Sequence, residues 1–181
     1  MSSNPGKIKK NTPFRRDARS DSDLKRIKKR ISLHGVALEA AGIGILITGA
    51  SGIGKTTSAM KAMIPGYFWI ADDLAVIDTS PEGTLMMTGH RKIQKYLHTD
   101  QTGIAEVRQV FPACQIKNKA RLDLIIDVVR TATDTVCLEL SEQEVLEARL
   151  PCVRITIPET GYFDQNLLHK AIMHYIKRSN K

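Results

Sequence analysis

A glycine-rich segment limits the fold of this chain more than any other sequence feature. Residues 49–56 read GASGIGKT and match the pattern Gly-x4-Gly-Lys-Ser/Thr in full. The preceding residues 43–48 are almost all apolar, which predicts a strand buried on both faces of an α/β sheet. Residues 55–63 are rich in helix-forming side chains and are followed by Pro65-Gly66, so a helix is expected directly after the segment.

This order of strand, glycine turn and helix predicts a phosphate-binding loop. Glycines allow successive backbone N–H groups to point into one concavity, and the N-terminus of the following helix adds partial positive charge. Lys55 would supply a cation for the β and γ phosphates of ATP, and the Thr56 hydroxyl would be a ligand for Mg²⁺. The alternative is a glycine-rich turn that binds nothing. The predicted nucleotide-binding residues are Gly49, Ala50, Ser51, Gly52, Ile53, Gly54, Lys55 and Thr56.

Two adjacent carboxylates follow the next predicted strand, residues 67–71. Asp72 and Asp73 stand at its carboxyl end, and ligands of open α/β sheets bind beyond the carboxyl ends of strands. We therefore expect the two aspartates to face the glycine loop. One carboxylate would hold Mg²⁺ and the other would accept a proton. The alternative is that both residues only begin a turn.

The remaining pattern predicts one α/β domain. Residues 31–38 alternate as a strand, and residues 74–77 and 84–87 form the two arms of a hairpin. Residues 88–120 give no clear pattern. In the last third, residues 122–129 and 154–158 read as strands, residues 141–148 as one or two helical turns, and residues 165–177 as an amphipathic helix.

The net charge of +8 belongs to the first 30 residues of the 181. This arm carries eleven lysines and arginines against three aspartates, whereas the other residues hold sixteen basic and sixteen acidic side chains. Its composition favours a disordered leader, residues 1–30, before a catalytic domain at 31–181. Nucleic-acid binding by the arm is the less favoured reading, because charge alone gives no base readout.

Composition excludes several other classes of protein. No run of eighteen apolar residues exists, so no membrane association is expected, and the basic N-terminus lacks the apolar core of a secretory signal. Three widely spaced cysteines give no disulfide framework and no metal pair. These features indicate a cytoplasmic protein.

Three segments together resemble a known family. Residues 33–36 (LHGV), 44–55 (GILITGASGIGK) and 70–73 (IADD), with their spacing, resemble the catalytic C-terminal domain of bacterial HPr kinase/phosphorylase. The resemblance implies a P-loop domain of the HPr kinase and PEP carboxykinase type, with a mixed sheet and flanking helices. The arm does not resemble the family's N-terminal domain, so the chain is expected to be a truncated form.

The resemblance also implies roles for individual residues. His34 matches the active-site histidine, Lys55 the nucleotide lysine, and Asp73 the carboxylate that takes the proton from an acceptor serine. Thr56 and Glu106 would be Mg²⁺ ligands, Glu106 through its likeness to the family's Glu-Ile-Arg segment. Asp72, from the pair of carboxylates described above, is the third predicted Mg²⁺ ligand. The reaction would be transfer of the ATP γ-phosphoryl group to a serine of HPr or a similar small phosphocarrier protein.

The chain departs from the family pattern at three places. Residues 109–111 replace a Gly-Leu-Gly stretch, Cys137 falls where the family has a catalytic arginine, and residues 159–163 replace a basic segment tied to dephosphorylation. Removing phosphate from phosphoserine requires positive charge there, so these departures argue against the phosphorylase reaction. Two alternatives stay open, a small-molecule kinase and a nucleotide-binding regulatory module without turnover. Family analogy further implies a homo-oligomer, a hexamer.

Overall fold

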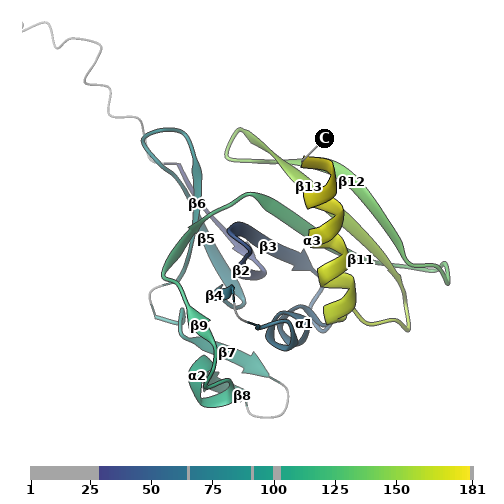
Figure 1. Cartoon of the computed structure of the whole chain (residues 1–181), viewed down its shortest axis with the longest axis horizontal. Coiled ribbons are helices and arrows are strands. Elements are labelled where there is room, and N and C mark those ends of the chain that lie inside the picture. The colour runs from purple at the N-terminus through teal and green to yellow at the C-terminus, as the bar shows by residue number, and fades with distance from the viewer. Residues whose placement is uncertain (1–28, 65, 91, 100–102, 180–181) are drawn as a thin grey trace, which may run out of the picture.

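The computed structural model describes residues 29–64, 66–90, 92–99 and 103–179 (Figure 1). The predicted basic arm, residues 1–30, lies outside the described residues apart from its last two. Within these ranges, no helix combines the length and the apolar character needed to cross a membrane. In chain order the elements are β1 (Arg30–His34), β2 (Val36–Ala40), β3 (Ile43–Gly49), α1 (Lys55–Lys61), β4 (Tyr67–Ala71), β5 (Leu74–Thr79), β6 (Leu85–Gly89), β7 (Tyr96–Thr99), β8 (Gly103–Glu106), α2 (Val107–Val110), β9 (Gln115–Ile116), β10 (Lys119–Arg121), β11 (Leu124–Thr131), β12 (Cys137–Val145), β13 (Ala148–Pro158) and α3 (Gln165–Ser179).

A mixed sheet forms the centre of the molecule. Across the described ranges it has seven strands in the order β12-β13-β11-β3-β2-β4-β9. Strand β11 lies parallel to both β3 and β13, whereas β2 runs antiparallel to its neighbours β3 and β4. The carboxyl ends of β3, β4, β11 and β13 therefore meet at one edge, which we call the carboxyl edge. The predicted α/β fold with a mixed sheet and flanking helices is confirmed.

Each face of this sheet is covered by a different layer. Helices α1 and α3 pack on one face, where Ala59 and Leu168 join a core with Ile47 and Ile126. The other face packs against a sheet that contains β1, β5, β6 and β10, with Leu46 in the shared core. Figure 1 shows α3 crossing in front of the central strands, with the β7–β8 hairpin and α2 at the lower end of the molecule. The sheet thus has the buried environment on both faces that its apolar strands require.

The single strand predicted over residues 31–38 is in fact two strands in different sheets. β1 pairs with β5, whereas β2 pairs with β3 and β4. The chain changes sheets at Gly35, which is buried and packs directly on strand β3. A Cβ at this position would lie 2.4 Å from the carbonyl oxygen of Ile47, so only glycine fits. Alternating side chains on both sides of Gly35 hid this change of direction.

The helical turns predicted over residues 141–148 are wrong, because this segment belongs to a hairpin. Strand β12 pairs antiparallel with β13 from Cys137 to Val145. Leu146 and Glu147 form the two-residue connection, both with positive φ (49° and 69°), as a type I′ turn requires. Neither residue is the Asn or Gly that normally marks such a turn, and the glutamates favour helix. Pairing with the long strand β13 overrides that local preference. The other predicted strands, the 74–87 hairpin and the terminal helix are confirmed.

Gly35→Ala tests the change of sheets. We expect the substitution to lower the free energy of unfolding by about 2 kcal/mol, because backbone must move to admit the methyl group. Ser32→Ala, at an exposed position of β1, is the control and should change it by less than about 0.5 kcal/mol. Equal stabilities of the two variants in urea unfolding would contradict the close approach.

Candidate functional site

The predicted glycine loop leaves β3 at the carboxyl edge and leads directly into α1. Its glycines have positive φ, 140° at Gly49, 71° at Gly52 and 106° at Gly54. At Gly54 a Cβ would also lie 2.6 Å from the carbonyl oxygen of Phe163. The loop therefore has a backbone path that L side chains rarely adopt, and it lies closely against the segment before α3. Strand, loop and helix follow one another as the sequence predicts.

Lys55 is the first residue of α1 and bends back over the loop. Its Nζ donates hydrogen bonds to the carbonyl oxygens of Gly49 and Ala50, each at 2.9 Å, and the residue is only 7% exposed. Burial lowers the pKa of the ammonium group, and the nearby carboxylates of Asp72 and Asp73 oppose this shift. A buried cation at the inner wall of a glycine loop is well placed to attract a polyphosphate.

Thr56 and Asp72 join the loop to the end of β4. The hydroxyl of Thr56 donates to Asp72 Oδ1 at 2.8 Å, and Asp72 is only 4% exposed. A hydroxyl and a carboxylate oxygen are hard donors of the kind that Mg²⁺ prefers, so this pair fits the predicted cation. Among the described residues, no three His, Cys, Asp or Glu side chains gather closely enough to hold a metal ion. In proteins, Mg²⁺ commonly takes several of its ligands from phosphate and water.

Asp73 is exposed to solvent and contacts His34. Its Oδ1 lies 3.1 Å from His34 Nδ1, and both side chains are about half exposed or more (65% and 52%). Asp73 has a φ of 64°, and the N–H of Leu74 donates to the carbonyl oxygen of Asp72 at 2.7 Å. This tight turn separates the two carboxylates, so that one is buried beside the loop and the other is accessible. Backbone strain of this kind is concentrated at functional sites.

Glu106, the third predicted metal ligand, lies on a different element of the structure from Thr56 and Asp72. It is the last residue of β8, on the hairpin at the lower end of the molecule in Figure 1. There it lines a depression with Lys95, Arg108, Ile116 and Asn118. Thr56 and Asp72 are not among the residues of that depression. The structure therefore brings Thr56 and Asp72 into contact, and Glu106 lines a depression that neither of them lines.

A polar group beside the loop was missed at the sequence level. Asp127 of β11 accepts hydrogen bonds from the hydroxyl of Thr48 (3.0 Å) and from Nε of Arg154 (3.2 Å). These contacts tie the last residues of β3 to two neighbouring strands directly before the glycine loop. The signal was present as one aspartate in the otherwise apolar run 124–129, where a partly buried charge needs a partner.

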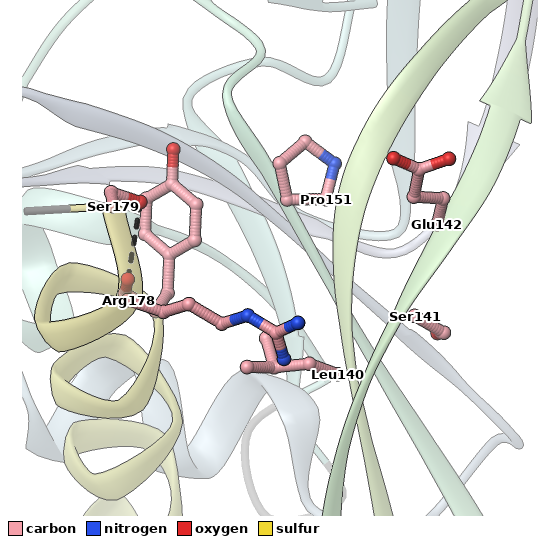
Figure 2. A pocket seen from close by; sticks show the side chains of 7 residues that line it. Leu140, Ser141, Glu142, Pro151, Arg178 and Ser179 are labelled. Atoms are coloured by element: carbon pink, nitrogen blue, oxygen red, sulfur yellow. Dashed lines mark hydrogen bonds between the residues drawn. The ribbon is translucent and has the colours of Figure 1, made fainter. Parts of the chain in front are cut away.

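A separate hollow lies between the hairpin of β12 and β13 and the end of α3 (Figure 2). Leu140 and Pro151 of the hairpin and Tyr175 and Arg178 of the helix line it. The figure shows the Arg178 side chain extending toward Leu140. None of the predicted site residues lines this hollow, so it is not part of the carboxyl-edge site.

These features define a class of protein: an α/β domain with a mixed sheet and a glycine loop at the carboxyl end of its central strand. Comparison with known proteins identifies the family within that class. Residues 25–181 match the family described as HPr Serine kinase C-terminal domain, and the chain belongs to that family. The resemblance inferred from residues 33–36, 44–55 and 70–73 is thereby confirmed.

Individual relatives give the same result. The HPr kinase/phosphorylase of Lactobacillus acidophilus is 27% identical over 154 residues, which are 83% of this chain and 48% of that protein. That of Geobacillus thermodenitrificans is 32% identical over 131 residues, 70% of this chain and 42% of the relative. The chain thus spans less than half the length of these curated relatives.

A solved structure shares the fold. The Hpr(Ser) kinase/phosphatase from Coxiella burnetii is similar with a TM-score of 0.69, over 83% of this chain and 99% of that one. The two sequences are 18% identical over the matched region, so the similarity concerns the arrangement of the elements.

The lowered pKa of Lys55 predicts a pH effect on stability. Between that lowered value and the ordinary value of 10.5, the unfolded chain binds the proton more tightly than the folded protein does. The free energy of unfolding of the wild type should therefore rise with pH in that window, relative to Lys55→Met. Urea unfolding of both proteins between pH 8 and pH 11 measures the difference. A difference that stays constant or falls would contradict the shift.

Proposed function

We propose that this chain is an ATP-dependent protein kinase of the HPr kinase type, which phosphorylates a serine of HPr or of a related phosphocarrier protein. The observation that supports the proposal most is that two neighbouring carboxylates lie in different surroundings. Asp72 is buried and bonded to Thr56 of the glycine loop, whereas Asp73 is exposed beside His34. One carboxylate thus faces the nucleotide side of the site and the other faces the side that an acceptor can reach.

The nucleotide would be held by residues 49–56. Backbone N–H groups of the loop and the Lys55 ammonium would contact the phosphates, and the carbonyls of Gly49 and Ala50 already fix that ammonium at the loop. Thr56 and Asp72 would hold Mg²⁺, which neutralises charge on the β and γ phosphates. The family membership and the fit of these donor groups support this assignment.

Asp73 would act as the general base of the transfer. Its carboxylate would take the proton of the acceptor serine hydroxyl while that oxygen attacks the γ-phosphorus, and ADP would leave with the bridging oxygen. His34 lies within hydrogen-bond distance of the Asp73 carboxylate and would hold it toward the acceptor. The exposure of both side chains leaves space for a protein serine.

We further propose that the reverse, phosphate-consuming reaction is absent. Residues 159–163 include no lysine or arginine, and Cys137 stands exposed at the start of β12. Arg130, which lies close to residues 159–163, directs its guanidinium to backbone carbonyls of that segment. In the reverse reaction, inorganic phosphate would have to bind beside the negatively charged phosphoserine. It would lack the cations needed to offset the repulsion between the two anions.

Asp73→Asn tests the kinase assignment. With labelled ATP, Mg²⁺ and HPr, the wild type should label HPr, and the variant should do so about a hundredfold to ten-thousandfold more slowly, because the general base is lost. Asn accepts positive φ, so the turn should persist. Asp134→Asn, at an exposed position between β11 and β12, is the matched control and should leave the rate unchanged.

Other outcomes would point to different functions. ADP formation without label on HPr would indicate a small-molecule acceptor. ATP binding with neither turnover nor transfer would indicate a nucleotide-binding module. An equal rate of HPr labelling in Asp73→Asn and the wild type would exclude Asp73 as the base.

A further inference from the structure

Residues 158–163, which join β13 to α3, pack against the glycine loop. The N–H of Phe163 donates to the carbonyl oxygen of Ile53 at 3.1 Å, and the carbonyl oxygen of Phe163 accepts from the hydroxyl of Ser58 at 2.5 Å. Both Phe163 (2% exposed) and Ile53 (0%) are buried. At Gly54 the loop backbone also lies against Phe163. Phe163 therefore contacts two loop residues, Ile53 and Gly54, and one residue of α1, Ser58.

One arginine holds the other end of this segment. Arg130, near the end of β11, pairs in register with Ile157 of β13. Its Nη1 donates to the carbonyl oxygen of Gly161 at 2.9 Å, to that of Glu159, and more weakly to that of Pro158 at 3.5 Å. One guanidinium nitrogen thus lies within hydrogen-bond distance of three carbonyl groups of this segment. Such charge-assisted hydrogen bonds are stronger than neutral ones.

We infer that Arg130 is a positioning residue for the phosphate site, acting through the 158–163 segment. The inference deepens the proposed function and rests on it. A continuous set of contacts runs from the Arg130 guanidinium to Gly161, from there along the chain to Phe163, and from Phe163 to Ile53 and Ser58. The hydrogen bonds of the Arg130 guanidinium go to carbonyl groups of residues 158–161, not to the loop itself.

The loop needs this support because its backbone is flexible. Glycines let the loop reach positive φ, but they also give it many other conformations in the absence of outside contacts. Ser51 and Gly52 are exposed, so the buried Ile53 is the part of the loop that the protein holds most firmly. If the supporting segment shifts, the binding-competent loop is populated less, and the apparent affinity for phosphate falls by that fraction.

The experiment compares Arg130→Met with Arg130→Lys in the full chain. The methionine keeps the aliphatic stem and removes the donors, whereas the lysine ammonium can donate to several carbonyls. We expect Arg130→Met to weaken binding of Mg·ATP about tenfold by calorimetry, in keeping with a loop that is competent about a tenth of the time. In the protein without ligand, amide hydrogen exchange of residues 51–54 should be faster in Arg130→Met than in the wild type. Arg130→Lys should restore part of both quantities.

Arg149→Met is the matched control. This arginine lies on the neighbouring strand β13, is 79% exposed, and reaches Glu142 only at 4.0 Å, so affinity and exchange should match the wild type. Wild-type affinity and wild-type exchange in Arg130→Met would overturn the inference. So would faster exchange spread equally over β11, β13 and α3, which indicates general loosening. If the wild type itself binds no ATP, the proposed function fails, and exchange at residues 51–54 still decides the role of Arg130.

Discussion

The candidate site depends on one antiparallel strand inserted between two strands of common direction. β3 and β4 both end at the carboxyl edge, and β2 begins there, between them. The residues that lead into β2 therefore arrive at the point where the glycine loop and the aspartates leave. Gly35 allows the backbone to pass against Ile47, and its N–H donates to the carbonyl oxygen of Asp73 at 3.2 Å. His34 reaches Asp73 because of this packing, although the two are far apart in the sequence.

The hydrogen bond between Thr56 and Asp72 closes the same region from the other side. It connects α1 to the end of β4 across the start of β2. Through Ile53 and Ser58 the loop also contacts the segment before α3, and through Thr48 the end of β3 contacts β11. The glycine loop is thus fixed at several points by elements distant in sequence. Such fixation prepares a site before its ligand arrives and reduces the entropy lost on binding.

Much of this arrangement was predictable from local patterns, and the remainder depends on tertiary contacts. The apolar run before the glycine loop and the paired aspartates after β4 placed two halves of the site at one edge, because parallel strand ends meet there. The split at Gly35 was not predictable from alternation, since it follows from the carbonyl of Ile47. Likewise, the Glu-rich segment 141–148 favours helix locally, and only its pairing with β13 makes it a strand. The role of Arg130 depends on three backbone carbonyls, which leave no mark in the sequence.

Strand β12 lies at the end of the central sheet, and its position affects how copies of the chain can associate. It presents exposed Glu139, Glu142 and Glu144 along one strand whose outer side pairs with no other strand among the described residues. Two such strands brought together antiparallel would set like charges close to one another, which disfavours pairing. Repulsion between these glutamates therefore disfavours the pairing of two β12 strands, which would join two central sheets into one.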